Sequence, residues 1–256
     1  MAKLNVTLAG REKVAEATYA FTLDLGGQPF EYRPGQTVDV IYPDPPYQDE
    51  TGNRRTFSLA CAPGKGRILV ATRDRRSAFK RSLIEAPLGT DLQIDGPYGS
   101  FTLPQKPTEA YLLAGGVGIT PFRSMVEDAL ERSLDHTLTL IHSNRTPEET
   151  PFLLELLKWG SEGGTGASEG SPPREGARPR FTYIPTMTQM EELPRSWQGD
   201  RRRVGPELLA EVLPTERNRP LYYIAGPQNF VRAAVDSLRK VGVEEDRTRA
   251  EEFPGY

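Results

Sequence analysis

Apolar and polar residues alternate in short runs over the first 104 residues of the chain. The runs lie at residues 4–8, 17–23, 37–42, 67–72 and 91–95. Alternation at a period of two is typical of strands with one buried face, and glycine and proline mark the turns between these runs. Many short strands of this kind favour an antiparallel barrel or sandwich. One short helix is expected near 77–85, with Ser77 as its N-cap.

The pattern changes after a polar connector at 103–108, because apolar strands then alternate with helical patterns. Strands are expected at 112–114, 137–141, 181–185 and 221–225, and helices at 121–132, 148–158, 206–212 and 228–241. This alternation predicts a parallel α/β sheet. We therefore expect two domains, 1–106 and 107–256. Within the second domain, residues 160–178 are rich in Gly, Ser, Glu and Pro and are expected to form a flexible surface loop.

One strand-to-helix turn stands out in the second half. The apolar run that begins at Tyr111 leads directly into Gly115, Gly116 and Gly118. The N-terminus of the following helix attracts phosphate groups, and glycines let a ligand approach the backbone. Pro121 stands where a G-x-G-x-x-G fingerprint would have its third glycine, so the common Rossmann pattern does not apply. The alternative is a tight turn with no ligand.

A second turn of this type follows the last predicted strand, at 225–231. Since the carboxyl ends of parallel strands meet at one edge of a sheet, both turns are expected at the same edge, where ligands bind in such sheets.

Composition narrows the classes of function. The chain has 256 residues and a formal net charge of −3, so no basic field indicates nucleic acid. No apolar run approaches the length of a membrane span, and residues 1–6 lack the features of a signal peptide, so a cytoplasmic protein is expected. Cys61 is the single cysteine, which excludes disulfides within the chain and cysteine-ligated clusters. We expect no metal site.

Two stretches of the first domain combine residues suited to a phosphorylated, flat ligand. On the strand around 54–60, Arg55 and Phe57 face one side while Thr56 and Ser58 face the other. An ordinary exposed strand is the alternative. Basic side chains surround the predicted short helix: Arg73, Arg75, Arg76, Lys80 and Arg81. These cations suit a diphosphate at the helix N-terminus or simply form a solvated face.

Taken in order, five motifs resemble the ferredoxin–NADP reductase superfamily over nearly the whole chain. They are residues 55–58, 96–99, 115–121, 225–227 and the aromatic C-terminus. The resemblance implies a six-stranded, Greek-key antiparallel barrel that binds FAD, less often FMN. It also implies a C-terminal α/β domain that binds NADPH or NADH.

The resemblance further implies roles for individual residues in flavin binding. Arg55 would hold a flavin phosphate, Phe57 would pack on the isoalloxazine, Ser58 would contact its N5 edge and Thr56 would contribute backbone contacts. Further flavin contacts would come from Thr72, Arg73, Ser77, Ala78, Phe79 and Lys80.

The nicotinamide nucleotide would lie against the two glycine turns. Its contacts would come from Gly115, Gly116, Val117, Gly118, Thr120, Pro121, Gly226 and Pro227. Ser143 and Arg145 could bind a ribose 2′-phosphate, and no acidic residue stands beside them, which favours NADPH.

Residues near the reacting rings are also implied by the resemblance. Ser58 and Thr120 would lie near flavin N5 and nicotinamide. Glu251 or Glu252 would be the acidic group of the family, with Glu252 our choice. Phe253 or Tyr256 would cover the flavin face. The chain departs from the family at Phe57, which lacks a tyrosyl hydroxyl, and at Ala225, where many relatives have cysteine.

The function implied is that of a flavin-dependent NAD(P)H oxidoreductase. Hydride would pass from nicotinamide to FAD, and electrons would pass on to ferredoxin, flavodoxin, an oxygenase component or a small-molecule acceptor. Two alternatives remain open. One is a non-catalytic regulatory or sensor module that binds flavin or nucleotide, and the other is a two-domain structural protein without a cofactor.

Overall fold

The computed structural model describes residues 3–75, 77–162, 181–190 and 199–253. Contacts divide the chain into two compact units. The first, here called the barrel unit, comprises Met1–Leu103 and Thr120–Asp128. The second, the α/β unit, comprises Pro104–Ile119 and Ala129–Tyr256. The predicted domain boundary at 106/107 stays a prediction.

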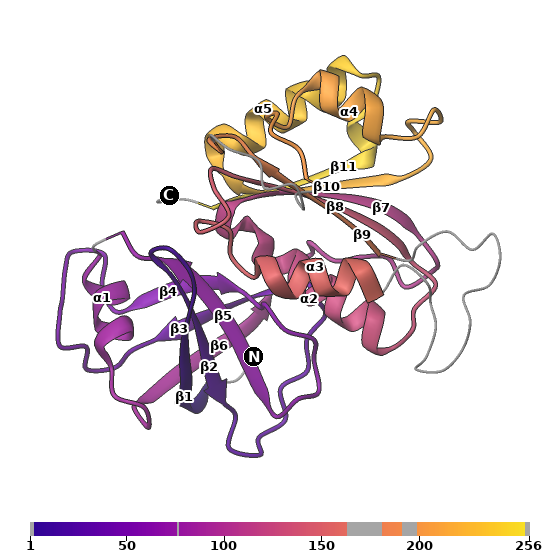
Figure 1. The fold of residues 1–256 in the computed structure, drawn as a ribbon. Helices are drawn as coiled ribbons and strands as arrows, with labels where there is room; N and C mark the ends of the chain where they lie inside the picture. The colour runs from indigo at the N-terminus through magenta and orange to yellow at the C-terminus, as the bar shows by residue number, and fades with distance from the viewer. Residues whose placement is uncertain (1–2, 76, 163–180, 191–198, 254–256) are drawn as a thin grey trace. The chain divides into compact units, whose positions relative to one another are not determined.

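The barrel unit contains a six-stranded antiparallel sheet, shown in Figure 1, as expected. Its strands are β1 (Leu4–Ala15), β2 (Thr18–Asp24), β3 (Thr37–Ile41), β4 (Arg54–Ser58), β5 (Arg67–Arg73) and β6 (Asp91–Tyr98). The order across the sheet is β4-β3-β6-β1-β2-β5, so β4 and β5 are its two ends. A hydrogen bond from Ala60 N to Leu69 O, 2.8 Å long, joins the chain just after β4 to β5. The two ends of the sheet are thereby brought together.

The side chains that alternate inward on these strands form the barrel core. Leu8, Phe21, Ile68 and Ile94 are fully buried there, together with Phe79 of α1 (Ala78–Glu85). The predicted cap of α1 is confirmed, because Ser77 Oγ accepts a hydrogen bond of 3.3 Å from Lys80 N. This fixes the N-terminus of α1 on the barrel.

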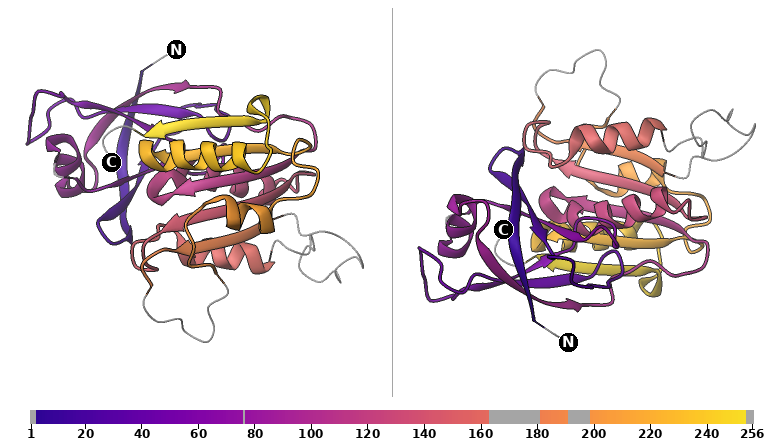
Figure 2. Two further views of the ribbon diagram at one scale, coloured as in Figure 1. Left: turned by 90° about the horizontal axis from the view of Figure 1, so that it is seen from above. Right: turned by 90° about the horizontal axis from the view of Figure 1, so that it is seen from below.

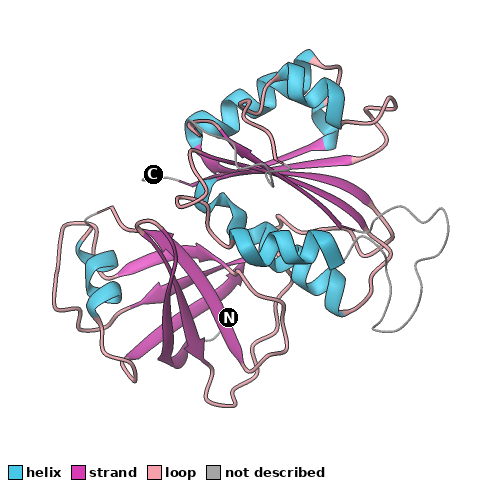
Figure 3. Cartoon of the chain, in the orientation of Figure 1, coloured by secondary structure: helices cyan, strands magenta, loops and turns pink. Residues whose placement is uncertain are grey.

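The α/β unit contains a five-stranded parallel sheet, with helices against both faces (Figure 3). Its strands are β7 (Glu109–Gly115), β8 (Thr137–Asn144), β9 (Phe181–Met187), β10 (Leu221–Pro227) and β11 (Thr248–Phe253). The order is β11-β10-β7-β8-β9. The apolar runs of β7 and β10 are buried almost throughout, which explains why they form continuous rather than alternating patterns.

Helices α4 (Pro206–Val212) and α5 (Gln228–Lys240) share one apolar core with the sheet, and α3 (Leu153–Glu162) packs against β9. Figure 2 shows α5 running along β11. The range predicted for α4 is confirmed, whereas α3 begins five residues later than the predicted 148. Phe152 has a positive φ of 60°, which a continuous helix does not permit. The first residues of the predicted loop, 160–162, belong to α3, and residues 163–178 lie outside the described residues.

Strand β11 is a feature that the sequence pattern did not predict. It pairs in parallel with β10, with Tyr222 opposite Thr248 and Pro227 opposite Phe253. Its residues are mostly half-buried or exposed, so they lack the apolar run that marks the other strands of this sheet. Residues 254–256, including Tyr256, lie outside the described part of the chain.

Helix α2 (Thr120–Glu131) follows a 3-10 turn, η1 (Gly116–Ile119), and its first part groups with the barrel unit. Ser124 Oγ donates a hydrogen bond of 2.8 Å to the carbonyl oxygen of Cys61, and the Arg123 guanidinium donates to the carbonyl oxygen of Ala60. The helix starts one residue before the predicted position, with Pro121 in its first turn, where a missing N–H is tolerated. No helix among the described residues has the length and apolar character needed to cross a membrane.

Candidate functional site

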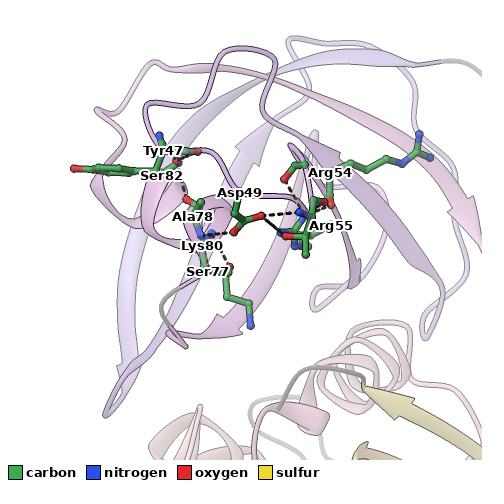
Figure 4. Close-up of polar contacts among 10 residues, drawn as sticks. Tyr47, Asp49, Arg54, Arg55, Ser77, Ala78, Lys80 and Ser82 are labelled. Carbon is green, nitrogen blue, oxygen red and sulfur yellow. Dashed lines mark hydrogen bonds and ion pairs between the residues drawn. The ribbon is translucent and has the colours of Figure 1, made fainter.

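The N-terminus of α1 holds an anion that is supplied by the protein itself. The Oδ2 atom of Asp49 accepts a hydrogen bond of 2.9 Å from Ala78 N, the first amide of the helix (Figure 4). Arg55 Nη2 lies 3.6 Å from the other carboxylate oxygen, Oδ1. A helix N-terminus and a guanidinium thus act on one carboxylate, which is an arrangement that also suits a phosphate.

Arg55 is held by the same loop that carries Asp49. Its Nη1 donates hydrogen bonds to the carbonyl oxygens of Thr51 and Gly52, at 2.9 and 3.0 Å. The guanidinium carbon lies 5.3 Å from the centre of the Phe79 ring, a cation–π contact. Its side chain is 21% exposed, so a ligand can still reach it.

The electrostatics of this place favour a negative charge. The pKa of Asp49 is lowered by hydrogen bonds from the Thr51 hydroxyl and Ala78 N, and further by the Arg55 charge. The pKa of Lys80 is lowered to about 8, first by burial and then by the positive charges of Arg75 and Arg55. Neighbouring cations repel one another, and this repulsion disfavours the charged form of Lys80. An anion bound among them would offset the repulsion.

The other predicted flavin residues of β4 lie close to this place. Phe57 is buried, with its ring centre 6.1 Å from that of Phe79. Thr56 points to the other face and donates to Asp39 Oδ1. Ser58 is buried at the end of β4. On β5, Thr72 is fully buried and its hydroxyl donates to the carbonyl oxygen of Arg73, at 3.3 Å.

In the α/β unit, the predicted nucleotide residues gather at the carboxyl edge of the parallel sheet. Strand register places Ser143 beside Gly115 and Glu252 beside Gly226. Gly115 and Gly226 are also adjacent, since a Cβ on Gly226 would lie 2.9 Å from the Gly115 carbonyl oxygen. The two turns predicted to share an edge do so.

Most of these glycines make room for protein rather than for open space. A Cβ on Gly115 would lie 2.6 Å from the Phe230 ring, and one on Gly118 would lie 2.2 Å from the carbonyl oxygen of Ala225. Gly116 differs, because its φ is +55° and a Cβ there would meet nothing within 4 Å. Gly115 and Gly118 therefore allow the two glycine turns to pack closely against each other. Gly116 plays no part in this packing, and the space beside it is open.

A buried histidine holds the Gly116 turn. His142 is fully buried on β8, and burial lowers its pKa to about 4, so the ring is neutral near pH 7. Because a carbonyl oxygen only accepts, Nε2 must donate to Gly116 O, 2.8 Å away. Nδ1 then accepts from the Tyr183 hydroxyl at 3.1 Å. The sequence pattern does not indicate this contact, because it joins residues 26 positions apart.

The two acidic candidates on β11 have different surroundings. Glu252 accepts a hydrogen bond of 3.0 Å from Gln228 Nε2 and forms an ion pair with Arg232. Glu251 has a buried Oε2 atom without a hydrogen-bond partner among the described residues, and burial raises its pKa to about 7. Glu251 is thus the carboxyl group poised to titrate near neutral pH. Phe253 is half-buried beside Pro227.

The remaining predicted residues occupy the start of α2 and the end of β8. Val117 is buried in η1, Thr120 is buried as the first residue of α2 and Pro121 follows it. Arg145 is exposed directly after β8. No group of three or more His, Cys, Asp or Glu side chains suited to a metal ion occurs within the described ranges.

The α/β unit, with two glycine turns at the carboxyl edge of a parallel sheet, has the architecture of a nucleotide-binding domain. The family model described as the oxidoreductase NAD-binding domain matches residues 112–236. Ferredoxin–NADP reductase B of Sorangium cellulosum is 31% identical over 237 residues, covering 89% of this chain and 87% of that protein. The chain belongs to the ferredoxin–NADP reductase superfamily.

Other relatives differ in length. Phthalate dioxygenase reductase of Burkholderia cepacia is 28% identical over 180 residues, which cover 67% of this chain and 53% of that protein. The chain spans about half the length of several curated relatives that it matches, 53% and 46% for two of them.

A solved structure has the same fold. The FAD/NAD-binding domain of nitric oxide dioxygenase from Vibrio cholerae superposes with a TM-score of 0.78 at 18% identity, over 98% of each chain. At that identity the likeness establishes the fold, and it confirms the barrel and α/β architecture expected from the sequence.

Proposed function

We propose that this chain is a flavin-dependent NAD(P)H oxidoreductase that uses FAD and passes electrons to a separate acceptor. The observation that carries the proposal is the anion position shared by Arg55 and the N-terminus of α1. Membership of the ferredoxin–NADP reductase superfamily and the NAD-binding family match at 112–236 support it. The Vibrio cholerae domain that shares this fold is itself described as binding FAD and NAD, which supports the choice of cofactors.

The residues present fit the phosphates of FAD. Asp49 is a stand-in anion that already receives a backbone N–H and a guanidinium, which are the donors that a phosphate needs. Arg55, Ser77, Ala78 and Lys80 would hold the phosphates. Phe57 and Phe79 would supply apolar surface beside them, and Ser58 would contribute a hydroxyl.

The nicotinamide nucleotide would lie at the carboxyl edge, against Gly116 and beside Gly226. His142 fixes the Gly116 carbonyl and therefore the course of the turn. Thr120 and Pro121 begin the following helix, whose N-terminus attracts phosphate. Ser143 and Arg145 would hold a ribose 2′-phosphate, so NADPH is the proposed donor over NADH.

Bound FAD would supply the redox chemistry, which is hydride acceptance from reduced nicotinamide followed by single-electron release. The chain binds and orients the two ring systems and excludes water. Glu251, and not the more firmly paired Glu252, is proposed as the acidic group that holds or moves a proton near the nicotinamide. Phe253 is proposed as the aromatic that covers a ring face, and Tyr256 keeps that role only as a sequence-based prediction.

The acceptor is proposed to be a redox protein such as ferredoxin, flavodoxin or an oxygenase component, with a small molecule as the alternative. The names of two relatives, a ferredoxin–NADP reductase and a phthalate dioxygenase reductase, support this range. A cytoplasmic location is part of the same proposal.

Anaerobic stopped-flow reduction of the purified protein with NADH and NADPH tests the proposal. We expect yellow protein with flavin absorbance that either nucleotide bleaches, with NADPH faster. Yellow protein that neither nucleotide bleaches would instead support the regulatory flavin-binding module. A colourless protein that cannot be reconstituted with FAD or FMN would rule out both.

A further inference from the structure

The β3–β4 loop places Asp49 where the proposed flavin phosphate must bind. Its carboxylate takes the Ala78 N–H bond at 2.9 Å and faces Arg55 at 3.6 Å. Thr51 N also donates to Asp49 Oδ1, at 2.9 Å. Because Ala78 N has one hydrogen to donate, this carboxylate and a phosphate cannot both take it (Figure 4).

The charge pattern of α1 explains why an external anion is needed there. Its first turn contains no acidic residue and carries Lys80, although a cation is disfavoured at a helix N-terminus. Burial and the charges of Arg75 and Arg55 both act against the Lys80 charge. Asp49 supplies the missing negative charge from outside the helix.

Arg55 is engaged by the same loop. Two of its hydrogen bonds go to the carbonyl oxygens of Thr51 and Gly52, and another goes to the Thr51 hydroxyl. A guanidinium presents five N–H donors in a fixed fork, so turning that fork toward a phosphate means releasing part of the loop.

The loop has a fixed end and a freer end. Ser82 Oγ accepts from Tyr47 N at 3.1 Å, and the Tyr47 hydroxyl donates to Glu85 at 2.7 Å, so Tyr47 is fastened to α1. Beyond it, residues 48–52 are exposed. Gly52 has a φ of +71° and open space around it, which lets the backbone change direction there. Asp49 can leave α1 without disturbing Tyr47.

We propose that Asp49 is an internal competitor for the flavin phosphate, displaced from Ala78 and Arg55 when a phosphorylated flavin binds. The inference rests on the proposed function and assigns a specificity-setting role to a residue that contributes no contact to the flavin. Asp49 offsets the charge of Arg55 and occupies the Ala78 N–H in the flavin-free protein, and it lowers the affinity for FAD and FMN. Riboflavin has no phosphate, so its affinity does not depend on Asp49.

Flavin titrations of the flavin-free protein test this inference. The variant is Asp49→Asn, which keeps an oxygen for the Ala78 N–H but removes the charge that competes for Arg55. Asp44→Asn is the matched control, because Asp44 is exposed on the same loop. Fluorescence quenching gives the dissociation constants of FAD, FMN and riboflavin for each protein.

We expect Asp49→Asn to bind FAD and FMN about three- to tenfold more tightly, with riboflavin unchanged, because the exposed ion pair with Arg55 is lost and the hydrogen bond from Ala78 N is no longer charge-assisted. Asp44→Asn should match the wild type for all three. Equal or weaker binding of FAD by Asp49→Asn overturns the inference, as does a gain of the same size for riboflavin. A wild-type protein that binds none of the three flavins rejects the proposed function, and the inference with it.

Hydrogen–deuterium exchange on the wild-type protein gives a second test that needs no variant. FAD should speed exchange of the peptide covering 48–53 while Ala78 stays protected, because a phosphate replaces the carboxylate. Riboflavin should leave 48–53 unchanged. Slower or unchanged exchange of 48–53 with FAD overturns the inference even if the Asp49 variant does not fold.

Discussion

The Nε2 atom of His142 donates a hydrogen bond of 2.8 Å to the carbonyl oxygen of Gly116. A core side chain on β8 thereby fixes the one glycine of the turn whose surroundings stay open. Tyr183 completes the chain of hydrogen bonds from β9. The position of the Gly116 turn, which is proposed to hold the nucleotide, therefore depends on two side chains of β8 and β9.

Replacement of His142 should show whether its hydrogen bond to Gly116 positions the turn for nucleotide binding. His142→Leu removes the donor, so we expect a KM for NAD(P)H about two- to tenfold higher, with FAD affinity unchanged. His142→Gln can keep a donor for Gly116 and should restore most of that loss. Steady-state kinetics with both variants checks this. An unchanged KM in His142→Leu would contradict the positioning role.

The same histidine should make stability depend on pH. Its folded-state pKa, about 4, lies below the ordinary 6.5, so the unfolded chain binds more protons between these values. Stability should fall as pH drops from 6.5 to 4, by about 3 kcal/mol in total. Urea unfolding of His142→Gln should lack this contribution.

Glu251 should have the opposite effect on the pH dependence of stability. Its folded-state pKa, about 7, lies above the ordinary 4.5, so its protonated form stabilises the fold at low pH. That contribution is lost as pH rises from 4.5 to 7. Glu251→Gln should remove this slope from urea unfolding and also remove a titration near pH 7 from the rate of flavin reduction. Glu252→Gln is the neighbouring control and should retain both.

The two glycines of the turn should differ in their tolerance of alanine. Gly118→Ala would push a methyl group against the Ala225 carbonyl, and we expect a loss of roughly 3 kcal/mol or more in unfolding free energy. Gly116→Ala meets no atom and should cost only about 1–2 kcal/mol for its positive φ. Equal losses in urea denaturation would contradict this assignment of the two roles.

Arg55→Ala should weaken FAD binding by about tenfold or more, because a charge-assisted hydrogen bond to phosphate is lost. Arg54→Ala is the matched control, since Arg54 instead bonds to Asp39 and Asp95 at 2.8 and 3.0 Å. Flavin titration of both variants measures the difference. Unchanged FAD affinity in Arg55→Ala would show that the phosphate is placed wrongly.

Local signals allowed much of the fold to be predicted. Ser77 caps α1, and Pro206 starts α4 at its predicted residue, because such end signals act within one turn of helix. The carboxyl-edge position of the two glycine turns also followed from the order of strands and helices.

Features that depend on distant partners were not predictable in this way. Strand β11 forms because β10 offers it an edge, and its own residues lack an apolar run. Asp49 reaches Ala78 across 29 residues, and nothing in the loop sequence indicates that contact. Helix α3 starts late because Phe152 adopts a positive φ, which helical periodicity does not reveal.

Because of helix α2, the two structural units do not correspond to two continuous stretches of sequence. The part that belongs to the barrel unit, Thr120–Asp128, follows the glycine turn in sequence and supplies donors for the carbonyl oxygens of Ala60 and Cys61. A gene fusion or recombination joint near residue 106 would separate the barrel from this segment and leave those carbonyls without it. We therefore expect a chimera that takes its barrel from a relative to keep these two hydrogen bonds only if residues 120–128 come from the same relative.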